Sequence, residues 1–230
     1  MSDAEASEED ANAPAWRKRA VSRSLNAARS RAEQRVQRFL DAAFELIDEK
    51  GTTEFTIQEV IDQSKQSLRG FYQYFDGKNE LLLALFEETI REATDDLRTV
   101  AESTDGPLER LRAFTIRLHE WCDPSDKPRT RGTHNRRPIM EFSVQLAVDH
   151  PDQVKAAMAP VSRIMVELVE AANAAGVIDV PDARRAAALI QQTVMYSWFG
   201  NRLAESARMR LTAEATWDFC LHGLGAGPDR

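Results

Sequence analysis

The chain has 230 residues, and 43% of them are hydrophobic, which is enough for one or two domains with a packed core. The formal net charge is −7, and the two cysteines, Cys122 and Cys220, argue against a disulfide framework or a cysteine-based metal cluster. No apolar run reaches the roughly 18 residues that span a bilayer, and the acidic first ten residues do not resemble a secretory signal. We therefore expect a cytoplasmic protein that does not enter a membrane.

Charge is segregated at the start of the chain. Residues 1–10 carry five acidic side chains and no basic one, whereas residues 11–30 carry five basic side chains and no acidic one. This small, polar and charge-segregated stretch predicts a disordered extension over residues 1–30. The basic half could lie along a DNA minor groove, or it could simply keep the chain soluble, and the residues leave both interpretations open.

Apolar residues at helical spacing predict a first helix from about Ser30 to Lys50, which Gly51 ends as a C-terminal cap. Thr53 or Thr56 could cap a second helix, and Thr56 with Glu59 has the spacing of a capping box. The turn after this helix is expected near residues 64–66.

A third, short helix is predicted from Ser67, its cap, through Tyr74, with Phe71 and Phe75 pointing inward. Two short helices joined by a tight turn are typical of a helix-turn-helix unit, whose second helix enters a DNA major groove. The domain that contains this unit is not basic in itself, so its phosphate contacts must come from a few residues and from the basic stretch before it.

The rest of the chain shows helical spacing and no pattern that favours a strand, so the predicted fold class is all-α. Turn and breaker residues such as Asp76-Gly77, Pro107 and Pro151 separate the expected helices. These are placed at about residues 78–100, 107–122, 138–149, 151–175, 182–205 and 212–224. A polar, basic loop is expected at residues 123–137.

Residues 31–86 resemble the N-terminal domain of TetR-like transcriptional regulators, with continuous spacing. The matching residues are Ala42, Ala43, Gly51, Phe55, Thr56, Ile57, Glu59, Val60, Ser67, Phe71, Tyr72, Gln73, Tyr74, Phe75, Lys78, Glu80 and Leu81. The resemblance implies a homodimer whose subunits have a three-helix DNA-binding domain, residues 31–77, and a larger helical domain, residues 78–230, for effector binding and dimerisation. Lys65 departs from the family, which usually has glycine in the turn, so it is expected to need a positive φ.

The candidate DNA-binding residues lie at the exposed start of the third helix and at family positions that usually touch phosphate. Arg69 has the two donors that read guanine O6 and N7, and Leu68 could touch a thymine methyl. For Arg69 an ordinary solvated arginine is the alternative, and for Tyr72 a place in the core. The full set is Thr56, Ser67, Leu68, Arg69, Gly70, Tyr72, Tyr74 and Lys78.

The helix at 182–205 is apolar almost all round, so it is expected to pack on its own core and on a second subunit, with the last helix beside it. The expected interface residues are Ala187, Val194, Trp198, Trp217 and Leu221. An apolar effector pocket is expected among the aromatic and methionine residues of the helical domain, although each of them could be plain core. The candidates are Phe114, Leu118, Trp121, Met140, Phe142, Met158, Met165, Gln191 and Met195.

No phosphate-binding loop, nucleophile elbow or metal-ligand set is present, and His119 with Cys122 supplies only two possible ligands. We therefore expect no enzyme, no cofactor and no metal. The predicted function is a repressor that binds double-stranded palindromic DNA as a homodimer and is released by a small, largely apolar effector. The alternatives are an effector-independent DNA-organising protein and, less favoured, an enzyme that uses the helical domain. The sequence does not identify the effector or the operator, and it does not decide between repression and activation.

Overall fold

The computed structural model describes residues 14–122, 134, 136–204, 206 and 209–225. Within these residues the secondary structure is helical and includes no strand, as the all-α prediction requires. The helices in chain order are α2 (Ala15–Lys50), α3 (Ile57–Ser64), α4 (Leu68–Phe71), α5 (Lys78–Glu102), α6 (Pro107–Cys122), α7 (Arg137–Asp149), α8 (Pro151–Ala174), α9 (Ala183–Leu203) and α10 (Ala213–Gly223). None of the described helices is long and apolar enough to cross a membrane.

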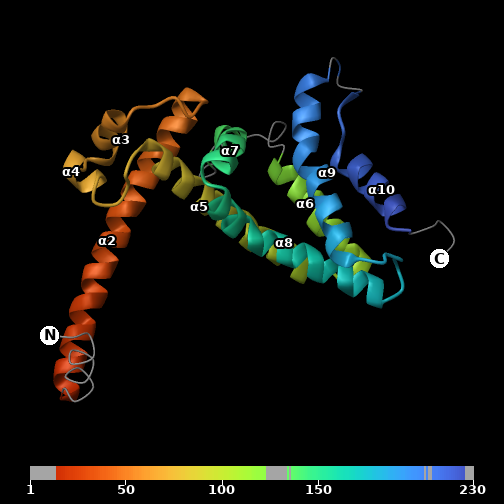
Figure 1. Cartoon of the computed structure of the whole chain (residues 1–230), viewed down its shortest axis with the longest axis horizontal. Coiled ribbons are helices and arrows are strands. Elements are labelled where there is room, and N and C mark those ends of the chain that lie inside the picture. The colour runs from red at the N-terminus through yellow and green to blue at the C-terminus, as the bar shows by residue number, and fades with distance from the viewer. Residues whose placement is uncertain (1–13, 123–133, 135, 205, 207–208, 226–230) are drawn as a thin grey trace.

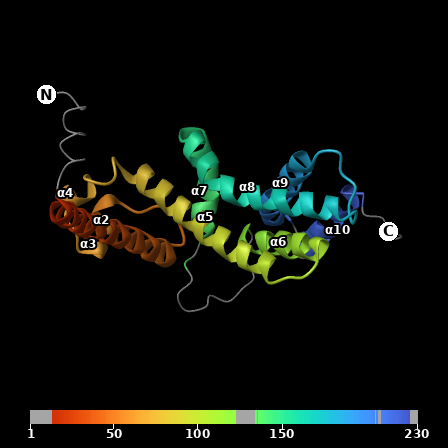
Figure 2. The same cartoon turned by 90° about the horizontal axis from the view of Figure 1, so that it is seen from below.

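The molecule is elongated, with two groups of helices joined by α5 (Figures 1 and 2). At one end α3 and α4 lie against the C-terminal half of α2, and α5 packs on the same helix. At the other end α6, α8, α9 and α10 pack together, while α7 lies against α5 and α8. The loop expected at residues 123–137 falls mainly outside the described residues, apart from His134, Arg136 and the first residue of α7.

The first helix is much longer than predicted. It begins at Ala15, so the expectation of disorder is wrong for residues 15–30, whereas residues 1–13 lie outside the described part of the chain. Between Ala15 and Lys50 there is neither glycine nor proline, and the alanines and arginines of this segment are strong helix formers. Once packing has fixed the C-terminal half of α2, each added residue extends an existing helix and avoids the cost of nucleation.

The ends of the short helices follow from local chemistry that the sequence predicted. The Thr56 hydroxyl accepts from the backbone N–H of Glu59 at 3.2 Å, and the Glu59 carboxylate accepts from the backbone N–H of Thr56 at 2.8 Å, which completes the capping box of α3. Gly51 ends α2 with φ 69°. Ser67 caps α4 through the N–H of Gly70 at 3.0 Å.

The helix α4 ends at Phe71, three residues before the predicted end at Tyr74. Residues 72–74 form a hydrogen-bonded turn instead, in which the backbone N–H groups of Tyr74 and Phe75 both donate to the Phe71 carbonyl at 3.0 Å. Because Phe71 and Phe75 are both buried, this turn brings two aromatic rings into the same core. The third helix is therefore a single turn that is held in place by the buried rings of Phe71 and Phe75.

Lys65 occupies the left-handed region, with φ 55° and ψ 33°, at the end of α3. It is the only residue other than glycine with a positive φ among those described. A side chain in this region costs about 1–2 kcal/mol, because Cβ approaches the following carbonyl oxygen. The expectation drawn from the missing glycine is therefore confirmed.

We predict that Lys65→Gly raises the free energy of unfolding by about 0.5–1 kcal/mol, because relief of the left-handed strain exceeds the added entropy of glycine in the unfolded chain. Urea denaturation measures it. Lys65→Ala is the matched control, since it keeps Cβ and removes the same charge. A gain for the alanine variant equal to that for glycine would show that the charge, and not the backbone, limits stability here.

Candidate nucleic-acid interface and effector cavity

Three phenylalanine rings hold α4 against the first helix. Phe39 of α2 meets Phe71 edge-on with centroids 5.5 Å apart, and it meets Phe75 at 6.2 Å. Phe71 and Phe75 contact each other at 5.3 Å, and all three rings are buried. Aromatic pairs of this kind add about 0.5–1.5 kcal/mol beyond the area they bury. The inner side of this short helix is thereby fixed, and the position of its outer side follows.

The outer side of α4 is polar and open to solvent. Ser67 and Arg69 are exposed, and Leu68 and Tyr72 are 50% and 53% exposed. The structure therefore corrects the alternative of Tyr72 as core, although its ring touches the edge of Phe71 at 5.5 Å. An added Cβ at Gly70 would come within 3.2 Å of the Ser67 hydroxyl oxygen, so a larger residue would crowd the cap. A helix start with small, polar and cationic side chains fits a base-reading surface.

The other three candidate DNA contacts are already engaged inside the protein. Both hydrogen-bonding functions of the Thr56 hydroxyl are used, because it accepts from the backbone N–H of Glu59 at 3.2 Å and donates to the Glu59 carboxylate at 3.0 Å. Tyr74 is half-buried against the core. The Lys78 ammonium lies 5.0 Å from the centroid of the Phe55 ring, in a cation–π contact. A phosphate contact from Thr56 would thus compete with the capping box of α3.

A charge contact ties the end of α2 to the start of α3. The Lys50 ammonium donates to Glu59 Oε1 at 2.7 Å. This bond, together with the N–H and hydroxyl of Thr56, lowers the pKa of Glu59 to about 2. The carboxylate therefore stays ionised at physiological pH, and the capping box stays formed.

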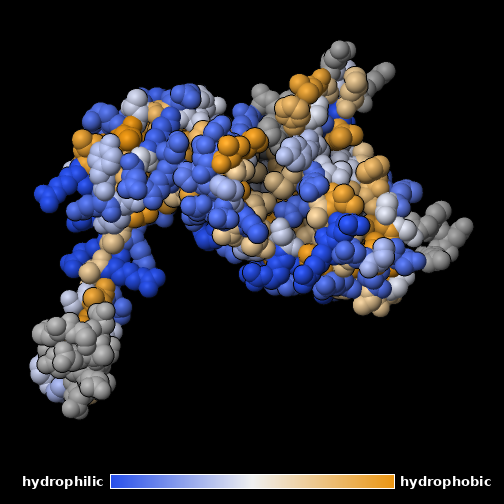
Figure 3. Space-filling view, viewed as in Figure 1, coloured by the Kyte–Doolittle hydropathy of each residue, from blue (hydrophilic) through white to orange (hydrophobic). Residues whose placement is uncertain are grey.

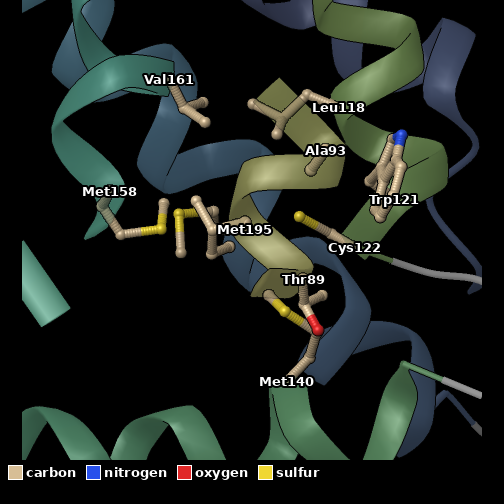
Figure 4. A pocket seen from close by; sticks show the side chains of 10 residues that line it. Thr89, Ala93, Leu118, Trp121, Cys122, Met140, Met158, Val161 and Met195 are labelled. Carbon is tan, nitrogen blue, oxygen red and sulfur yellow. The ribbon is translucent and has the colours of Figure 1, made fainter. Parts of the chain in front are cut away.

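An apolar cavity lies in the helical body between α5, α6, α7, α8 and α9 (Figure 4). Five predicted pocket residues line it: Leu118, Trp121, Met140, Met158 and Met195. The other five wall residues were not predicted from the sequence: Thr89, Ile90, Ala93, Cys122 and Val161. In Figure 4 the sulfurs of Met158 and Met195 lie close together at one side of the cavity.

The cavity is nearly filled in this structure. Its volume is about 20 Å³, which is room for about one water molecule. The three methionines in its wall have long, unbranched side chains that repack at low cost. A ligand larger than water would therefore enter only by moving these side chains.

Four predicted pocket residues do not line this cavity. Phe114 and Met165 are completely buried, so they are core residues rather than pocket wall. Phe142 is half-buried against the core. Gln191 accepts a hydrogen bond from the Ser162 hydroxyl at 2.9 Å, and this bond joins α9 to α8.

Two residues between α6 and α7 connect the cavity wall to α2, at the end of the molecule that carries α4. His134 Nδ1 lies 2.9 Å from an Asp48 carboxylate oxygen, and its ring stacks on Phe44 at 4.7 Å. Both partners belong to α2. Arg136 donates to Glu92 of α5 at 2.7 Å and lies 4.1 Å from the ring of Trp121, which lines the cavity. Sequence patterns gave no sign of these contacts, because the partners lie far apart in the chain, with 86 positions between His134 and Asp48.

Asp96 holds the same wall from the other side. Its carboxylate accepts hydrogen bonds from Trp121 Nε1 at 2.6 Å and from Arg117 at 2.7 Å. Burial alone would raise the pKa of Asp96, but the bonds from Arg117 and Trp121 outweigh it and lower the pKa below the usual value. The indole of Trp121 is therefore fixed between Asp96 and Arg136, so any movement of this ring is transmitted to both.

The interface residues expected on α9 and α10 face inward. Ala187, Val194 and Trp217 are buried within the single chain, which corrects their assignment to a subunit interface, while Leu221 is half-buried and the side chain of Trp198 is outside the description. A different set of apolar residues is exposed on these two helices: Leu189, Tyr196, Phe199, Leu203 and Phe219. The two sets lie on opposite sides of α9, and its sequence is apolar on both.

Two residues of this exposed set, Leu189 and Phe219, line an open groove of about 440 Å³ between α9 and α10. Figure 3 shows hydrophobic side chains gathered over the C-terminal end of α9, at the end of the molecule away from α4. Large exposed apolar patches are typical of interaction sites. The described residues contain no group of three or more possible metal ligands.

The family described as bacterial regulatory proteins, tetR family, has a model that matches residues 39–85. The transcriptional regulator BetI of Brucella anthropi is 30% identical over 80 residues, which are 35% of this chain and 41% of BetI. The chain thus spans about two-fifths of the length of the curated relatives it matches.

Solved structures extend the likeness to most of the chain. A tetR-family regulatory protein from Rhodococcus RHA1 has a TM-score of 0.62 at 17% identity, over 84% of this chain and 98% of that protein. AibR, solved in complex with isovaleryl coenzyme A and operator DNA, has a TM-score of 0.57 at 18% identity, over 84% and 98%. The chain therefore shares the overall fold of these tetR-family structures, and residues 39–85, which span α3, α4 and the adjoining parts of α2 and α5, match the model of that family.

Proposed function

We propose that this protein is a ligand-responsive transcriptional regulator that binds a palindromic operator as a homodimer and releases it when a small apolar effector enters the helical body. The observation that carries the proposal is the presentation of α4: its inner side is clamped by Phe39, Phe71 and Phe75, and its outer side offers Arg69 and Tyr72 to solvent. In this proposal the protein acts on DNA in the cytoplasm.

Arg69 is the base-reading residue in this proposal. It is exposed at the start of a helix whose position is fixed by buried rings, and its guanidinium carries the paired donors that match guanine O6 and N7. Ser67 and Tyr72 flank it with hydroxyl groups suited to phosphate, which sets the register of the helix on the duplex. Thr56, Leu68, Gly70, Tyr74 and Lys78 complete the proposed surface.

The homodimer forms through the exposed apolar residues of α9 and α10. Leu189, Tyr196, Phe199, Leu203 and Phe219 would be covered by the same residues of a second copy, as a two-fold interface requires. The groove between the two helices is then filled from the partner side. This pairing sets the distance between the two α4 helices, which a palindrome with half-sites one helical turn apart must match.

The effector binds where Trp121, Met140, Met158 and Met195 meet. The cavity is apolar and small, and AibR shows that a protein of this fold is compatible with both an acyl thioester ligand and operator DNA. Expansion of the cavity displaces the Trp121 ring and with it Arg136. His134, two residues earlier, carries the displacement to Asp48 and Phe44 of the DNA-binding domain.

The low volume of the cavity favours one second candidate, a DNA-organising protein that uses the same helix-turn-helix without an effector. The two are separated by selecting a duplex from a random library and then adding short acyl thioesters and small aromatic molecules. Sequence-selective binding that one of these compounds releases supports the regulator. Binding without sequence preference and without any release supports the DNA-organising protein.

We predict that Arg69→Ala lowers the discrimination between the selected duplex and a scrambled one by roughly 1–3 kcal/mol, because a bidentate base contact is lost. Tyr72→Phe should weaken both duplexes alike, since a phosphate contact carries no sequence information. Fluorescence anisotropy titrations measure all four affinities. Arg98→Ala on α5 is the control. An equal loss on both duplexes for Arg69→Ala would remove Arg69 as a base reader.

We predict that Leu189→Lys combined with Phe219→Lys converts the protein to a monomer, since a subunit interface cannot bury two unpaired ammonium groups. Both residues are more than half exposed in one chain, so the fold should survive. Sedimentation analysis gives the mass, and circular dichroism checks the helices. Val144→Lys with Val148→Lys on α7, equally exposed, is the control and should leave a dimer. A double α9–α10 variant that stays dimeric would refute this interface.

We predict that His134→Ala weakens operator binding several-fold without changing base preference, because the DNA-binding domain loses its stacked and hydrogen-bonded contact with the body. Hydrogen exchange at the end of α2, residues 44–50, should become faster. His222→Ala, an exposed histidine on α10, is the control. The coupling route fails if the two alanine variants show the same exchange and the same affinity.

A further inference from the structure

The N-terminal part of α2 carries a charge opposite to that of the rest of the protein. Residues 15–38 hold eight basic side chains and one acidic one, whereas residues 39–85, which match the family model, hold nine acidic side chains and four basic ones. A domain with that excess of carboxylates cannot by itself neutralise the phosphates of a duplex. The basic charge it lacks lies in the helix that leads into it.

This helical extension is a rod continuous with the DNA-binding domain. Its 24 residues, Ala15–Arg38, span about 36 Å at 1.5 Å per residue, which is close to one turn of B-DNA. In Figure 1 the rod projects beyond the packed part of α2, and its free end reaches the same end of the molecule as α4, away from α9 and α10. In Figure 1 this free end lies below α4, so a duplex held by α4 passes beside the rod when it runs parallel to it.

The basic residues are available on one side of the rod. Arg23, Arg31, Arg35 and Arg38 are exposed, and helical spacing places them within about one third of the circumference. Among the described residues none of these four forms an ion pair. Arg29, by contrast, pairs with Glu33 at 2.7 Å.

We infer that the extension Ala15–Arg38 is a second DNA-contacting element, which lies along the phosphates of the duplex outside the bases reached by α4. The inference rests on the proposed DNA-binding function and adds a surface to it. The contacts are electrostatic and independent of sequence, so they lengthen the bound duplex and steepen the dependence of affinity on salt. Each arginine that neutralises a phosphate releases about 0.9 counterion.

A basic helix with one apolar side also suits an anionic membrane surface, but two observations favour DNA. On the side away from the four arginines only two large apolar residues are exposed, Val21 and Leu25, because Val36 packs against the core. Together with Ala28 and Ala32, they offer little area for insertion among lipids. The rod is also rigidly continued into the domain that carries α4, so DNA bound there brings phosphates to the arginines.

The test compares the triple variant Arg23→Gln, Arg31→Gln and Arg35→Gln with the control Arg98→Gln, Arg112→Gln and Arg163→Gln, in the full chain. Both lose three charges from exposed positions, but the control positions lie on α5, α6 and α8. Affinity is measured between 50 and 200 mM salt on a duplex selected by the wild-type protein, in a short form and in a form longer by one turn on each side. Binding to vesicles of phosphatidylserine and phosphatidylcholine is measured in parallel.

The expected result is that wild-type protein and control bind the longer duplex more tightly than the short one, whereas the rod variant does not. The slope of log affinity against log salt should fall by about 2–3 for the rod variant on the longer duplex. Its preference for the selected over a scrambled sequence should persist, which separates this inference from the role of Arg69. Equal slopes for the two triple variants, or a loss confined to vesicle binding, would overturn the inference.

Discussion

The contact between α2 and α4 through Phe39, Phe71 and Phe75 is the constraint on which the rest of the structure depends. A helix of one turn has almost no stability of its own, because nucleation is not repaid over four residues. The three rings supply the stability that the backbone hydrogen bonds of so short a helix cannot. Lys65 ends α3 and Ser67 caps the start of α4, so these two residues set the angle between the two helices. The outer residues of α4 are therefore held at fixed positions without belonging to a long helix.

The same helix α2 links the two ends of the proposed mechanism. Its middle packs on α4, its C-terminal end receives His134 through Asp48 and Phe44, and its N-terminal part forms the basic rod. A small rotation of this one helix would change the aim of α4 and the position of the rod together. Trp121 lines the cavity and contacts both Asp96 and Arg136, so a ligand that displaces its ring would also move these two residues.

Local chemistry made the DNA-binding domain predictable from the sequence. Capping boxes, C-terminal glycines and the strained Lys65 depend on residues a few positions apart, so their signatures are legible without a structure. The start of α2 was missed because residues 15–30 show few apolar side chains, and a helix can extend into solvent on propensity alone once its other end is anchored.

The helical body was less predictable for two physical reasons. Helix α9 is apolar on both sides, so the sequence alone could not decide whether Val194 or Tyr196 faces the core, and only packing against α6, α8 and α10 resolves it. The wall of the cavity is assembled from helices far apart in the chain. For this reason Ala93 and Val161 were not predicted as wall residues, although five of the predicted residues do line the cavity. Long-range contacts such as that between His134 and Asp48 produce no periodic pattern in the sequence.

In the proposed homodimer, a symmetric pair of subunits presents two α4 helices together at the spacing of a duplex. Spin labels at Gln73→Cys, an exposed position beside Tyr72, would report that spacing by pulsed electron resonance on the DNA-bound protein, because Cys122 and Cys220 are buried. We expect a single distance close to one helical turn, about 35 Å. The absence of an intersubunit distance, or one that no multiple of the helical repeat can match, would contradict it.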